Sequence, residues 1–65
     1  MDPEVVALIE RAETGLQRVL RDLRQQPNTW EERARVLLAL QEVATHLVEA
    51  SRRYAEQLSR EAGEQ

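Results

Sequence analysis

The sequence contains no cysteine, no lysine and no phenylalanine. Without cysteine there is no disulfide framework and no thiolate metal site. His46 is the only histidine, so we expect no metal centre within one chain. A chain of 65 residues has little core of its own, and disulfides, metals or oligomerisation are the usual remedies. Because disulfides and a metal centre are excluded, oligomerisation is the remaining way to stabilise the fold.

Long apolar runs are also absent. No stretch is long enough to span a membrane, and no signal-peptide pattern opens the sequence, so we expect a cytoplasmic protein without a membrane partner. All 9 basic residues are arginine, but the net charge is −3 and no segment is polybasic, which argues against strong nonspecific binding to nucleic acid. The sequence has no catalytic constellation and no cofactor motif, which indicates a non-enzymatic protein without a cofactor.

The abundant residues, mainly Ala, Leu, Glu, Gln, Arg and Val, favour helices. Asp2 is suited to cap a helix that has Pro3 at its first position. Pro27 biases Gln26 away from helical angles, which predicts a first helix over about residues 3–26. We interpret Gly15 as a tolerated helix glycine, with close approach of another helix as the alternative. An apolar seam at coiled-coil spacing runs along this helix: Val5, Ile9, Ala12, Leu16, Val19 and Leu23.

A capping box of Thr29 and Glu32 predicts a second helix. It covers about residues 30–62 and leaves residues 63–65 as a frayed tail. Its apolar residues form two adjoining seams that span about 160° of the helix, so it needs at least two neighbours. The first seam is Val36, Leu40, Val43, Leu47, Ala50 and Tyr54, and the second is Leu37, Ala44, Val48, Ser51, Ala55 and Leu58.

The short connection favours an all-α, antiparallel helical hairpin that forms a single domain over residues 1–65. The helices would be about 36 Å and about 50 Å long, which places Pro3 opposite about Arg53. The end of the second helix then has no partner within the chain. We therefore predict a homodimer that forms a four-helix bundle, and the pattern leaves the relative orientation of the two hairpins open. The predicted interface is Val36, Leu40, Val43, Leu47, Ala50, Tyr54 and Leu58.

The length, the hairpin layout and the heptad spacing resemble the small Rop-type helical hairpins. Members of that family dimerise into four-helix bundles and bind paired RNA loops through the outer faces of their first helices. The resemblance implies an RNA-binding regulator that uses Arg11, Arg18 and Arg21. The family's lysine-rich first helix with a phenylalanine is not reproduced in this chain, and no residue motif carries over.

An arginine ridge lies on the first helix, opposite its seam. We interpret it as a solvated face, with contact to phosphates or to an acidic protein surface as the alternative. Its three arginines are candidates for partner binding, and it contains no acid. The ridge consists of Ala7, Arg11, Thr14, Arg18, Arg21 and Gln25.

Two single residues carry further interpretations. Trp30 is interpreted as an end plug that packs near Leu20 and Leu23 across the turn, with an anchor for a partner protein as the alternative. His46 is interpreted as an exposed histidine beside Glu42, and metal ligation by this pair is the alternative. The function we expect is a small interaction or regulatory module that binds another protein as a homodimer. The alternatives are the RNA-binding regulator and a small subunit of a larger hetero-assembly.

Overall fold

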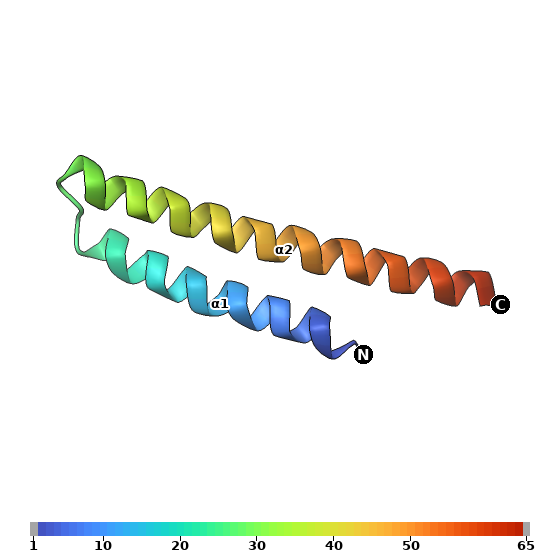
Figure 1. Cartoon of the computed structure of the whole chain (residues 1–65). Coiled ribbons are helices and arrows are strands. Elements are labelled where there is room, and N and C mark those ends of the chain that lie inside the picture. Colours follow the sequence, from blue (N-terminus) through green and yellow to red (C-terminus); the bar gives the residue numbers. More distant parts are fainter. Residues whose placement is uncertain (1, 65) are drawn as a thin grey trace.

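The chain folds into two long helices joined by a short turn. A computed structural model describes residues 2–64, with side chains through Gly63, and contains no strand in this part of the chain. Helix α1 spans Pro3–Arg24 and helix α2 spans Trp30–Glu64. They lie side by side and antiparallel in an elongated hairpin of 55 × 15 × 13 Å (Figure 1). The predicted all-helical hairpin is confirmed.

Helix α1 has the predicted start and an earlier end. The Asp2 carboxylate accepts the N–H of Glu4 at 2.9 Å, as expected of a capping residue. The helix ends at Arg24 and not at the predicted residue 26. Gln26 has a left-handed φ of 55°, and its N–H donates to the Leu23 carbonyl at 3.0 Å. The chain therefore turns at Gln26, immediately before Pro27 prevents further helix.

The start of α2 uses the predicted capping pair in a slightly different way. Thr29 Oγ1 accepts the N–H of Glu32 at 3.1 Å, whereas the Glu32 carboxylate accepts the N–H of Asn28 at 3.1 Å. A standard capping box would place that second bond on Thr29. At its other end α2 continues to Glu64, so residues 63 and 64 of the predicted tail are helical. Gln65 lies outside the described residues.

The core of the hairpin contains only valine and alanine side chains, and no leucine, isoleucine or aromatic residue is buried in the described part of the chain. The buried residues recur every seven positions on each helix: Val5, Ala12 and Val19 on α1, and Val36, Val43 and Ala50 on α2.

Gly15 sets how closely the helices approach. A Cβ atom at this position would lie 2.6 Å from Val43 Cγ2, which is too close for two carbon atoms. The interpretation of Gly15 as a merely tolerated glycine is therefore wrong, because the Val43 side chain of α2 occupies the space that a side chain at position 15 would need.

The register of the two helices follows from two contacts. Gly15 lies against Val43, and Arg53 forms an ion pair with Glu4 in the first turn of α1. The expectation that Pro3 lies opposite about Arg53 is thus confirmed. Beyond this point α2 has no neighbour among residues 2–64, the part of the chain that the structure describes (Figure 1). We call residues 54–64 the overhang.

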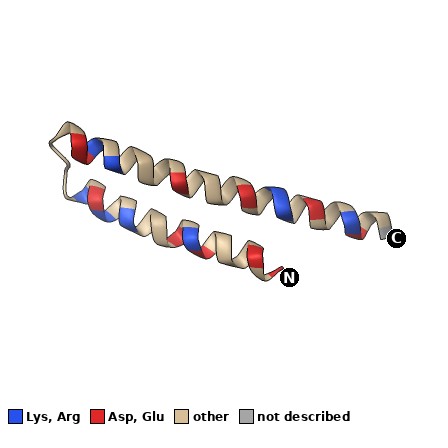
Figure 2. Ribbon diagram, viewed as in Figure 1, with Lys and Arg blue, Asp and Glu red and all other residues tan. Residues whose placement is uncertain are grey.

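Charged residues of both signs are spread along both helices (Figure 2). Glu49 forms ion pairs with Arg52, three residues later, at 2.7 Å and with Arg53, four residues later, at 3.1 Å. Arg52 and, more weakly, Arg53 lower the pKa of the Glu49 carboxylate below its usual value. These pairs lie at the surface and are partly open to solvent, so we assign them only a small effect on stability.

Candidate interaction surfaces

One side of the hairpin is an apolar face built from both helices. The residue four positions after each buried one is a large apolar residue that stays exposed. An i,i+4 step turns about 40° around a helix axis, and the same step in two antiparallel helices leads to the same side of the pair. The exposed residues related in this way are Ile9, Leu16 and Leu23 on α1, and Leu40, Leu47 and Tyr54 on α2.

Other exposed apolar residues widen this face. Val6 and Leu20 extend it on α1, and Leu37, Val48 and Leu58 extend it on α2. Their positions on the helical wheel place them on the same flank of the buried stripes. The face therefore runs along the hairpin and continues onto the overhang.

The predicted dimer interface divides into two groups. Val36, Val43 and Ala50 are buried in the core of the hairpin, whereas Leu40, Leu47, Tyr54 and Leu58 remain 41–51% exposed on the apolar face. A signal for this division was present in the sequence. The valine and alanine positions form one heptad row on each helix, and the leucine-rich positions form the next.

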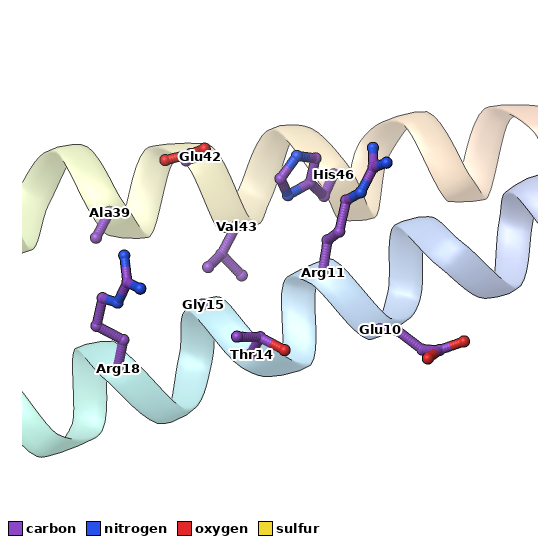
Figure 3. Close-up of a pocket in the computed structure, with 9 residues that line it drawn as sticks. All are labelled: Glu10, Arg11, Thr14, Gly15, Arg18, Ala39, Glu42, Val43 and His46. Atoms are coloured by element: carbon purple, nitrogen blue, oxygen red, sulfur yellow. The ribbon is translucent and has the colours of Figure 1, made fainter.

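The opposite side of the hairpin contains a polar groove with a volume of about 550 Å³. Gly15 and Val43 line it at the closest approach of the helices. Arg11, Thr14 and Arg18 line it from α1, and Ala39, Glu42 and His46 line it from α2. Figure 3 shows both arginine side chains extending from α1 towards α2, whereas Glu10 points away from the groove.

The three arginines of the ridge on α1 do not share one environment. Arg11 and Arg18 line the groove, and among the described residues neither is in an ion pair. Arg21 lies outside the groove, 3.8 Å from Asp22. The groove thus presents two guanidinium groups whose donors are open to an anionic ligand.

His46 differs from its predicted environment. It was expected to be exposed, but it is half-buried, and its Nδ1 atom is buried without a hydrogen-bond partner. Its position three residues after buried Val43 places it at the edge of the hairpin core, facing the groove beside Arg11 (Figure 3). Within residues 2–63, no three His, Asp or Glu side chains gather as a metal site.

Trp30 is also placed differently from its interpretation. Its side chain is 78% exposed, so it is not an end plug of the hairpin. The physical reason is its direction, because Trp30 lies about 120° around α2 from the buried residue Val36. The structure leaves its large apolar ring uncovered at the turn.

Neither described helix has the length and apolar character needed to cross a membrane. No protein-family model, curated protein or solved structure matches this chain.

Proposed function

We propose that this protein is a non-enzymatic interaction module that acts as a homodimeric four-helix bundle. The observation that carries the proposal is the apolar face. A folded chain of 7.5 kDa exposes roughly 4,200 Å² when compact, whereas the hairpin exposes 5467 Å². The excess is about 1,200 Å², and a standard interface buries about 800 Å² of each partner.

A second copy of the chain is the occupant that suits this face. A two-fold interface uses the same patch on both chains, and the apolar face is continuous over both helices. Packing two such faces together would bury Leu40 and Leu47, which the hairpin leaves exposed. The leucine side chains would then form the centre of the bundle core, which in the single hairpin consists only of small valine and alanine side chains.

The first experiment compares a leucine on the apolar face with one away from it. Leu38 is also exposed, but it lies about 180° around α2 from Leu47. We expect Leu47→Glu to abolish the dimer and most of the helicity, because a buried carboxylate without a partner is strongly unfavourable. Leu38→Glu should remain a helical dimer. Sedimentation and circular dichroism measure both properties.

A Leu47→Glu variant that stays dimeric would exclude this face as the interface. A parent chain that folds only together with a different protein would instead support the hetero-assembly subunit.

The partner-binding site in this proposal is the polar groove. Two hairpins joined by their apolar faces would leave a groove on each outer side. Arg11 and Arg18 favour a partner with closely spaced carboxylates, because guanidinium groups form paired hydrogen bonds with them. We therefore assign the groove to an acidic segment of another protein.

The second experiment measures binding of a glutamate-rich peptide and of a structured RNA hairpin at low salt. Binding of the peptide should weaken at least several-fold in an Arg11→Ala/Arg18→Ala variant and should be unchanged in Arg60→Ala, which removes an arginine from the overhang. No peptide binding by the parent dimer would contradict the assignment. Tight RNA binding with a steep salt dependence would favour the nucleic-acid regulator.

A further inference from the structure

Two parts of the apolar face remain exposed in a single hairpin, one at each end. The overhang carries Tyr54 and Leu58, which are 47% and 51% exposed. At the opposite end of the molecule, the turn end exposes a second cluster that the short helix α1 shares with the start of α2. This turn-end cluster consists of Leu20, Leu23 and Leu37.

Two hairpins can join their apolar faces in two two-fold arrangements, and these differ in whether the overhangs are covered. If both turns lie at the same end, each α2 packs against the partner's α1. That helix stops at Pro3, level with Arg53, so both overhangs remain uncovered. If the turns lie at opposite ends, each α2 packs against the partner's α2, and each overhang lies beside the partner's turn.

We propose that the two hairpins associate with their turns at opposite ends, and that each overhang packs on the turn-end cluster of the other copy. This inference rests on the proposed homodimer. Full overlap of the two α2 helices, Trp30–Glu64, centres the two-fold axis near Leu47. Leu40 and Tyr54 are each seven residues from Leu47, so each pairs with the other across the axis.

The same register pairs the remaining large side chains. Leu37 lies level with the partner's Leu58. The contact of Gly15 with Val43 fixes the register of α1 and brings Leu20 level with about Leu37 of its own chain. The partner's overhang therefore lies in the angle between the end of α1 and the start of α2, which is where Leu20 and Leu23 are exposed.

One further feature agrees with this arrangement. Arg33 and Glu61 are each fourteen residues from Leu47, so each end of the interface brings an arginine level with the partner's carboxylate.

Engineered cysteines test the arrangement directly, because the chain has no cysteine of its own. A Leu37→Cys/Leu58→Cys variant should form a cross-linked dimer under mild oxidation. Leu37→Cys alone should not, because its copies would be about 30 Å apart along the bundle. Leu38→Cys/Leu58→Cys is the matched control, since residue 38 faces away from the interface.

Two outcomes would overturn the proposal, and they differ from a failure of the dimer itself. A variant that sediments as a dimer under reducing conditions but is not cross-linked by the 37/58 pair would exclude the opposite-end arrangement. Cross-linking of the single Leu37→Cys variant as efficiently as the pair would do the same. A monomer under reducing conditions would instead contradict the proposed function.

Discussion

At the scale of single residues, the environment across the helix pair decides what each side chain does. Gly15 and His46 were interpreted from their own helix, and Trp30 was interpreted as packing across the turn. All three are placed differently in the structure. The helical wheel gives the direction of a side chain but not the distance to the opposite helix. The contact between Gly15 and Val43 shows how closely the two helices approach each other.

The two glycines provide a matched test of this contact. Alanine normally stabilises a helix by up to about 1 kcal/mol relative to glycine, but at position 15 its methyl group would overlap the Val43 side chain. Overpacking costs about 1–3 kcal/mol, so Gly15→Ala should lower the free energy of unfolding. Gly63 has no neighbour within 4 Å, and Gly63→Ala should be neutral or slightly stabilising.

Thermal and urea unfolding at equal protein concentration check both variants. If Gly15→Ala were as stable as Gly63→Ala, the close helix contact would not exist in solution.

At the scale of elements, the sequence predicted both helices and the start of each one. Asp2 and Thr29 cap the helices as expected, because their side-chain oxygens accept hydrogen bonds from N–H groups in the first turn. The end of α1 was less predictable. Proline disfavours the helical conformation at the residue before it, but this rule alone does not require a left-handed residue. The turn at Gln26 therefore ended α1 at Arg24, earlier than predicted.

Adjacent glutamines test the turn. Gln26 has a φ of 55° and Gln25 has a φ of −80°. A left-handed conformation costs an L-residue about 1–2 kcal/mol, and glycine avoids this cost. Glycine also has greater conformational freedom in the unfolded chain, which offsets part of this gain. Gln26→Gly should therefore raise the free energy of unfolding by up to about 1 kcal/mol.

Gln25→Gly is the control and should lower the free energy of unfolding by about 0.5–1 kcal/mol, because it gains only flexibility. Chemical denaturation of both variants measures the difference. Equal destabilisation by the two substitutions would argue against the left-handed turn.

At the scale of the whole molecule, the sequence indicated a wide apolar arc with two heptad rows on the second helix, but not which row packs against the first helix. The predicted interface combined Val36, Val43 and Ala50, which hold the hairpin together, with residues that remain exposed. Helical periodicity gives each residue a direction, whereas the division depends on which direction the first helix occupies. The polar groove was unpredictable for the same reason, since Arg11 and His46 meet only when the two helices are placed together.

The central claim is that two hairpins complete each other's core. Sedimentation equilibrium of the unmodified chain at low micromolar concentration, with circular dichroism on the same samples, tests it most directly. The homodimer should have a mass twice the 7.5 kDa of one chain, and helicity should be lost as it dissociates on dilution. A fully helical monomer of 7.5 kDa would contradict it.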